Sequence, residues 1–142
     1  KGDVELALKD YSRAIELDAK HEDALYNRGL VYVKIKDYEK ALADFEKTLE
    51  LNPEAVDAYC NMGNVRYEMG KFDEAIRDYT AALKVNSDDG DLYYNRGIAY
   101  LSKGLEERAM VDLKSAAQEG HEEARKYLRL PVPGGGGGTE VH

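Results

Sequence analysis

Apolar residues recur along the chain every three or four positions, in stretches that short polar segments separate. In residues 4–17, for example, Val4, Leu8, Tyr11 and Ile15 fall on one side of a helix. This spacing predicts an amphipathic α-helix. No window alternates apolar and polar residues as a half-buried strand would. The pattern therefore predicts an all-α chain.

The helical pattern itself repeats with a period of 34 residues. Gly29, Gly63 and Gly97 are spaced at this interval, and three further columns keep it beside them. These columns are Ala7, Ala41, Ala75 and Ala109; Asp10, Asp44, Asp78 and Asp112; and Tyr11, Phe45, Tyr79 and Leu113. A unit of this length cannot bury an apolar face alone, so neighbouring units must stack into a solenoid. Such a chain offers a surface for holding other molecules rather than a cleft for chemistry.

Small residues inside the predicted helices indicate where two helices cross closely. The first helix of each unit (helix A) carries the glycine, and the second (helix B) carries the alanine. A glycine inside a helix costs about 0.5–1 kcal/mol relative to alanine, so its recurrence at one register indicates a packing role. The pairs Lys36–Asp37, Gly70–Lys71 and Gly104–Leu105 suit the turn between A and B, and Asn52–Pro53 and Asn86–Ser87 end the B helices.

The residues that carry the period resemble the tetratricopeptide repeat (TPR) family, and the resemblance covers nearly all of residues 2–129. The second repeat supplies Leu25, Gly29, Tyr32, Ala41, Phe45 and Pro53, the third Tyr59, Gly63, Ala75, Tyr79 and Ala82, and the fourth Tyr93, Gly97, Tyr100, Ala109 and Ala116. In the third repeat, Arg66 replaces the aromatic residue that the family has at its eleventh position. The resemblance implies an all-α TPR α-solenoid of antiparallel helix pairs that form a right-handed superhelix.

The TPR register also predicts the organisation of the chain. It gives a partial first repeat with helix B only at 1–21, repeats at 22–55, 56–89 and 90–123, a short C-terminal capping helix at 122–130, and a Pro/Gly-rich tail at 131–142. In this register the first helix lacks its A partner, so we expect its apolar face to be incompletely covered. The capping helix should cover the fourth repeat with Ala124, Tyr127 and Leu128 on one face. The glycine run of the tail is typical of a flexible linker.

Composition narrows the range of partners and compartments. The net charge of −8 argues against nucleic-acid binding, which needs a basic footprint. No apolar run approaches the roughly 20 residues of a membrane helix. Cys60 is the only cysteine and cannot form an internal disulfide, which together with the lack of a secretory signal favours a cytoplasmic location.

No residue pattern predicts an enzyme. His21, His121 and His142 are far apart in sequence and match no metal-ligand spacing, and Cys60 lies in no nucleophile motif. The carboxylates recur with the repeat, which marks them as scaffold or solvated surface. The glycine run follows a helix end, whereas a phosphate-binding loop would follow a strand. We therefore expect no catalytic residue, no metal and no cofactor.

Arginine and aspartate columns predict ion pairs between helices A and B. Arg28 and Arg96 occupy the seventh position of their repeats and should pair with aspartates at the twenty-third position. Met62 takes the seventh position of the third repeat, so we expect at least one of these aspartates to lack an arginine. The pairs are expected to be structural.

In TPR proteins helix A lines the concave face of the solenoid. The resemblance implies a peptide-binding groove that contains Asn27, Asn61 and Asn95 in one column, with Tyr26, Lys34, Asn64, Tyr67, Tyr94, Asp23, Asp57 and Asp91. Asparagine carries both a donor and an acceptor, so the column could bond the backbone of an extended peptide. The TPR region of the O-linked N-acetylglucosamine transferases is similar in this respect. Asparagine is common at this position throughout the family, however, and a column without a role in binding remains the alternative.

A better-known use of the fold can be tested on single residues. Cochaperone TPR domains hold the C-terminal carboxylate of a chaperone with lysine, arginine and asparagine side chains at fixed positions of their A helices. Counted from the second repeat, Tyr26, Leu30, Asp91 and Asn95 occupy four of these positions, and no register supplies the cations. The sequence therefore argues against a carboxylate clamp.

The hypothesis from sequence is a non-enzymatic scaffold that binds a protein or peptide. Its concave groove would hold an extended segment that is neutral or basic, because Asp23, Asp57, Asp91 and Glu68 face only Lys34 there. Two alternatives stay open. The chain could be the substrate-targeting module of a larger enzyme, or a scaffold that self-associates through its first helix or its C-terminal tail.

Overall fold

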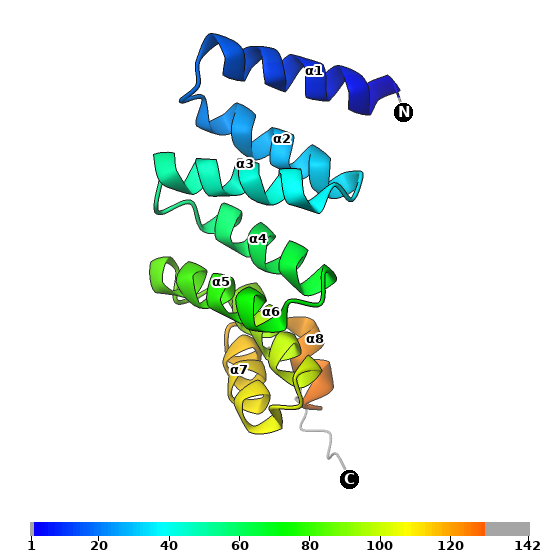
Figure 1. Ribbon diagram of the computed structural model, residues 1–142. Helices are drawn as coiled ribbons and strands as arrows, with labels where there is room; N and C mark the ends of the chain where they lie inside the picture. The colour runs from blue at the N-terminus through cyan, green and yellow to red at the C-terminus, as the bar shows by residue number, and fades with distance from the viewer. Residues whose placement is uncertain (1, 130–142) are drawn as a thin grey trace.

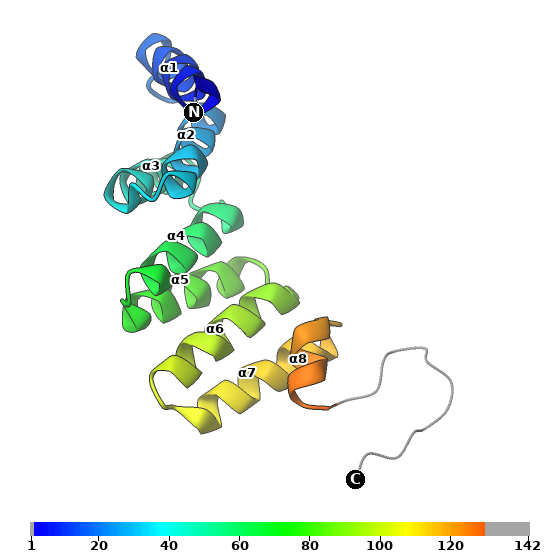
Figure 2. The ribbon, with the colours of Figure 1, turned by 90° about the vertical axis from the view of Figure 1, so that its right-hand side faces the viewer.

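The computed structural model describes residues 2–129, and every regular element in this range is an α-helix. The helices are α1 (Gly2–Leu17), α2 (Glu22–Lys34), α3 (Tyr38–Leu51), α4 (Val56–Glu68), α5 (Phe72–Val85), α6 (Gly90–Ser102), α7 (Glu106–Gln118) and α8 (Glu122–Tyr127). Figures 1 and 2 show these helices stacked in chain order, with α1 at one end of an elongated array and α7 and α8 at the other. The predicted all-α solenoid is confirmed.

Three antiparallel helix pairs, α2 with α3, α4 with α5, and α6 with α7, form the body of the solenoid. Each pair crosses where a glycine of the A helix meets a large side chain of the B helix. A Cβ atom on Gly29 would lie 2.6 Å from Cε1 of Phe45, and one on Gly63 would lie 2.5 Å from Cε1 of Tyr79. These distances are shorter than a real Cβ contact, so Gly29 and Gly63 have the packing role that the sequence predicted, while a Cβ on Gly97 would lie 3.2 Å from Cγ of Leu113.

The core consists of three clusters along the solenoid, and each is centred on one large B-helix side chain. Phe45, Tyr79 and Leu113 are at most 2% exposed. The alanines of the periodic column in α3, α5 and α7 are fully buried beside them. Each cluster also contains side chains of the next A helix or of α8, so burial joins successive pairs as well as the members of one pair.

The turns between helices A and B place one residue in the left-handed region. Gly70 and Gly104 adopt φ values of +78° and +79° in the second and third of these turns. Lys36 occupies the corresponding place after α2 with a φ of +63°. A side chain at this conformation is strained, because Cβ approaches the following carbonyl oxygen.

Helix α1 differs from the other long helices because none of its residues is buried. Val4, Leu8, Tyr11 and Ile15 are half-buried, in the part of the molecule where α1 packs against α2. Leu17 is 74% exposed. The expectation that the apolar face of α1 is incompletely covered agrees with these exposures.

Helix α8 packs against α7 at the other end of the solenoid. Ala124 is fully buried there, and Leu128, one turn later, is half-buried against the same cluster. The expectation that Tyr127 shares this buried face was wrong, because its side chain is 52% exposed. Ala124 and Leu128 are four residues apart and therefore lie on the same side of the helix. The predicted tail at 131–142 lies outside the described residues.

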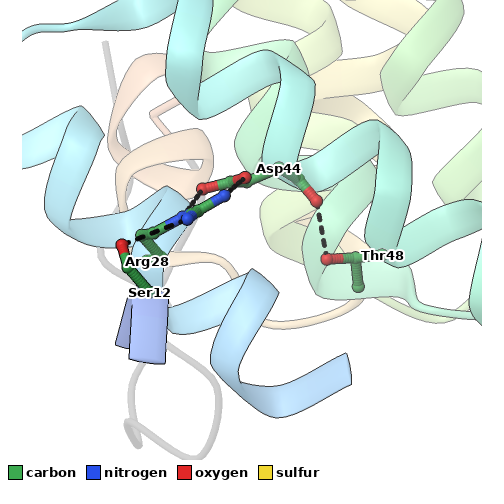
Figure 3. A network of polar contacts seen from close by, with 4 residues as sticks. All are labelled: Ser12, Arg28, Asp44 and Thr48. Atoms are coloured by element: carbon green, nitrogen blue, oxygen red, sulfur yellow. Dashed lines mark hydrogen bonds and ion pairs between the residues drawn. The ribbon is translucent and has the colours of Figure 1, made fainter. Parts of the chain in front are cut away.

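Arginine side chains connect three helices at a time. Arg28 on α2 donates from Nε and Nη2 to the two carboxylate oxygens of Asp44 on α3, at 2.8 and 2.7 Å, and from Nη1 to Oγ of Ser12 on α1 at 3.2 Å (Figure 3). The Oγ1 atom of Thr48 donates to the backbone oxygen of Asp44 at 2.8 Å. Arg96 repeats this arrangement with Asp112 on α7 and Thr80 on α5.

Met62 was expected to leave an aspartate of this column without an arginine, and for the aspartate of the third repeat this was wrong. Asp10 on α1 is the aspartate of the column that forms no ion pair with an arginine of the range 2–129. Arg66 bonds both carboxylate oxygens of Asp78 through Nη1, each at 2.9 Å. Arg66 lies one helical turn after Met62, on the same face of α4, so it reaches the same aspartate from the eleventh position. Met62 in turn takes a buried apolar place and is 5% exposed. The arginine and the large apolar residue have exchanged positions in this repeat.

Candidate functional site

Side chains of successive A helices meet along one face of the solenoid. The Nδ2 atom of Asn61 on α4 donates to the hydroxyl of Tyr26 on α2 at 2.8 Å. The hydroxyl of Tyr67 on α4 lies 2.8 Å from Oγ of Ser102 on α6. These hydrogen bonds join positions that the sequence placed in the groove, so we refer to this face of α2, α4 and α6 as the groove.

The asparagine column is not a set of equivalent groups. Asn61 uses both amide hydrogens, because Nδ2 also donates to the backbone oxygen of Asp57 at 2.9 Å. Asn95 donates from Nδ2 to Oδ1 of Asn64 at 3.4 Å, which uses one of its two amide hydrogens. The carbonyl oxygens of Asn61 and Asn95, and one amide hydrogen of Asn95, therefore remain for a partner. Asn27 makes no side-chain hydrogen bond to any residue in the range 2–129.

A hollow of about 240 Å³ lies in the groove between α4 and α6. We call it the notch, and its walls are Asn64, Tyr67, Glu68, Tyr79, Tyr94, Asn95 and Ile98. Five of these residues belong to the predicted groove columns, and Tyr79 reaches the notch from α5. Tyr79 is 2% exposed and donates from its hydroxyl to Oδ1 of Asn64 at 2.6 Å. The sequence showed Tyr79 only as a core residue, because nothing in a B-helix column indicates that its hydroxyl reaches the groove.

A second hollow, of about 400 Å³, lies where α2 and α4 begin. The carboxylate residues Asp23 and Asp57 line it together with Glu22 and Glu54, and Tyr26 forms part of its wall. Asn52, which follows α3, donates from Nδ2 to Oε1 of Glu22 at 2.9 Å. This end of the groove is therefore strongly acidic, as the sequence predicted for the groove as a whole.

Asp91 and Tyr94 both contact a histidine that sequence reasoning missed. The ring of His121 stacks on Tyr94 with 4.2 Å between centroids and an interplanar angle of 15°. Its Nε2 atom lies 3.3 Å from Oδ1 of Asp91, and its Nδ1 atom accepts from the backbone N–H of Ala124 at 3.2 Å, so it caps α8. A recurrent segment could have revealed the cap, because His-Glu-acidic-Ala occurs at 21–24 and at 121–124. His21 caps α2 through the same kind of bond.

The charges of the groove affect its titratable groups in a consistent direction. Burial, followed by the nearby carboxylates of Asp89, Asp57 and Asp91, raises the pKa of the Cys60 thiol to about 11. Burial, followed by Asp57, raises the pKa of the Tyr26 hydroxyl. The thiol is thus uncharged at neutral pH. Lys34 is exposed and forms no ion pair with a residue of the described range.

The described residues offer little support for other kinds of site. No group of three or more His, Cys, Asp or Glu side chains in the range 2–129 is arranged to hold a metal ion. None of the helices α1 to α8 is both long and apolar enough to cross a membrane.

The sequence matches family models for tetratricopeptide repeats. One, described as a TPR repeat, matches residues 1–36 and 63–104, together more than half of the chain. Three described as tetratricopeptide repeats match residues 22–54, 45–77 and 90–119. No curated protein sequence matches the chain.

Solved structures with the same fold include several of the protein MamA. A crystal structure of MamA has a TM-score of 0.80 and 22% identity, and covers 92% of this chain and 81% of its own. The structure of MamA from residue 41 to the end, from Desulfovibrio magneticus RS-1, has a TM-score of 0.79 and 20% identity, and the match covers 90% of this chain and 83% of the MamA chain. Another MamA crystal structure has a TM-score of 0.78 and 26% identity, and the match covers 91% of this chain and 69% of the MamA chain. At these identities the likeness supports the fold.

Proposed function

Because this chain belongs to the tetratricopeptide repeat family, whose members bind protein partners, we propose that it is a non-enzymatic scaffold that holds an extended segment of another protein in its groove. The observation that carries the proposal is the set of hydrogen bonds between successive A helices. These bonds align exposed polar and aromatic side chains of α2, α4 and α6 on one face.

The groove offers acceptors and negative charge more than it offers donors. Both amide hydrogens of Asn61 and one of Asn95 are used within the protein, and the carbonyl oxygens of both residues can accept from backbone N–H groups of a bound segment. The carboxylates of Asp23 and Asp57 line the acidic hollow at one end. A neutral or basic segment therefore fits the groove better than an acidic one, since complementary charge selects partners and speeds encounter.

The proposal can be tested with defined peptides. Fluorescein-labelled repeats of Gly-Ser-Lys, Gly-Ser-Met and Gly-Ser-Glu are titrated with the protein, and anisotropy is measured at low and high salt. We expect the lysine peptide to bind best and to weaken as salt screens the carboxylates. Replacing Asn27, Asn61 and Asn95 together by alanine should weaken binding by at least about 10-fold, since each lost hydrogen bond contributes roughly 0.5–1.5 kcal/mol.

A matched control is Gln118→Ala, which removes an exposed amide side chain from helix α7 outside the groove. This variant should bind the lysine peptide as the parent does. If the triple asparagine variant also binds as the parent does, while circular dichroism shows both to be folded, recognition does not use the asparagine column.

Self-association is a second candidate, because Leu6 and Leu17 of α1 are 60% and 74% exposed. Together with the half-buried apolar face of α1, these side chains offer apolar surface that a second copy of the chain could bury. Light scattering over a concentration series would detect it as a molecular mass that rises with concentration. For either function we propose a reducing, cytoplasmic setting, in which the half-buried thiol of Cys60 stays free.

A further inference from the structure

The notch between α4 and α6 has walls of a kind that suits one class of side chain. We propose that it receives a single cationic side chain, lysine or arginine, from the segment bound in the groove; this rests on the proposed function. The volume of about 240 Å³ lies below the roughly 300–1,000 Å³ of small-molecule pockets, so the notch fits one side chain better than a whole small molecule.

The aromatic walls of the notch are held in place by other side chains. The hydroxyl of Tyr67 bonds Ser102, and its ring lies 5.1 Å from the ring of Phe72. The ring of Tyr94 stacks on His121. A pocket that is already ordered before binding loses little conformational entropy when a partner enters, which favours affinity.

The chemistry of the walls favours a cation with an aliphatic stem. The faces of tyrosine rings attract a cation, and Ile98 offers apolar surface to the methylene groups of lysine or arginine. Glu68 adds a carboxylate at the same hollow, and its side chain is exposed and forms no ion pair with a described residue. No lysine or arginine of the range 2–129 is among the residues that line the notch.

Other occupants fit these walls less well. An anionic side chain would be repelled by the carboxylate of Glu68. The carboxylates of Asp57, Asp89 and Asp91, which act on the neighbouring thiol of Cys60, would repel it as well. A purely apolar side chain would cover the Glu68 carboxylate without a partner, and burying an unpaired charge is unfavourable. A cationic side chain satisfies the carboxylate and the rings together.

The experiment uses the Gly-Ser-Lys and Gly-Ser-Met peptides with two matched carboxylate variants. Glu68→Gln removes the charge at the notch, and Asp23→Asn removes an exposed groove charge outside it. We expect Glu68→Gln to weaken the lysine peptide by about 2–5-fold and to leave the methionine peptide unchanged. Asp23→Asn should have a smaller effect. The proton resonances of the lysine ε-methylene groups should shift upfield on binding to the parent, because tyrosine ring currents act on a side chain held over the rings.

The results separate the notch from the groove. Equal weakening by Glu68→Gln and Asp23→Asn, with no upfield shift, would overturn the notch proposal, while the salt dependence and the asparagine variants would still support the groove. Tighter binding of a Gly-Ser-Phe peptide than of the lysine peptide would show an aromatic occupant and would also overturn it. No measurable binding of the lysine peptide would overturn both proposals.

Discussion

The crossing of α4 and α5 provides the sharpest test of how this solenoid is packed. In Gly63→Ala the added Cβ would lie 2.5, 2.8 and 2.9 Å from three atoms of the Tyr79 ring. The ring cannot move away freely, because it is 2% exposed and its hydroxyl bonds Asn64 at 2.6 Å. The substitution must therefore separate the helices or break that hydrogen bond.

Gly97→Ala is the matched control, since its Cβ would approach Leu113 Cγ only to 3.2 Å. Both substitutions gain up to about 1 kcal/mol from helix propensity. Overpacking costs about 1–3 kcal/mol, and we expect nearly all of it in Gly63→Ala and little in Gly97→Ala. Gly63→Ala should thus be less stable than Gly97→Ala by about 1–3 kcal/mol, and Gly63→Leu should be less stable still.

The measurement is urea unfolding followed by circular dichroism, with hydrogen exchange to locate the loss. A repeat protein need not unfold in one step, so local exchange matters as much as the midpoint. Protection should fall first in α4 and α5 of Gly63→Ala. If Gly63→Ala proves as stable as Gly97→Ala, the close crossing does not constrain the fold and the argument from the glycine column fails.

Three further predictions concern single side chains. Lys36→Gly should raise the free energy of unfolding by about 0.5–1 kcal/mol in thermal melts, because it relieves the left-handed strain at a φ of +63°; an unchanged melting temperature would contradict this. Cys60, with its pKa raised to about 11, should react with iodoacetamide at pH 8 about 100-fold more slowly than in urea-unfolded protein, and equal rates would show the thiol to be unperturbed. Arg66→Met should destabilise by about 3 kcal/mol because it leaves Asp78 buried without its partner, whereas the exposed control Arg13→Met should change stability by less than about 0.5 kcal/mol. Burial already raises the pKa of Asp78 in the folded state, which favours folding as pH falls through that pKa, so the Arg66→Met deficit measured by urea unfolding should shrink toward acid pH.

The fold could be predicted because its determinants recur with the chain's own period. Gly29, Gly63 and Gly97 each lie opposite a large residue 16 positions later, and this contact lets each A helix cross its B helix closely. Turn residues and helix ends repeat with the same interval. Because the same residue type recurs at the same position of several repeats, the repeats can be compared with one another in the way that aligned homologous sequences are compared.

The prediction from sequence failed in the third repeat, where the aspartate is paired by an arginine at a different position of helix A. The column register treats the seventh and eleventh positions as separate, whereas in a helix they lie one turn apart on one face. Arg66 therefore replaces the missing arginine for Asp78, and Met62 fills the apolar place that an aromatic residue takes elsewhere. Reading the helix face together with the column would have found this pair.

The sequence indicated which side chains lie on the groove face, but it did not indicate which of their donors and acceptors are already used in hydrogen bonds within the protein. Hydrogen bonds such as that from Asn61 to Tyr26 join residues 35 positions apart, and they depend on the angle between successive A helices. No local pattern indicates that angle. The stacking of His121 on Tyr94 was hidden for the same reason, since it depends on how α8 closes the last repeat.

The bonds that join successive A helices also determine what the groove can offer a partner. Each amide hydrogen that Asn61 or Asn95 uses within the protein is one that a peptide carbonyl cannot accept. Apart from Asn27, Lys34 and one amide hydrogen of Asn95, the groups that remain for a partner are carbonyl oxygens, carboxylates and tyrosine rings, which attract donors or cations. The same hydrogen bonds thus join the A helices to one another and favour a donor-rich, basic segment as the partner. A variant such as Tyr26→Phe, which releases an amide hydrogen of Asn61, would therefore alter both properties together.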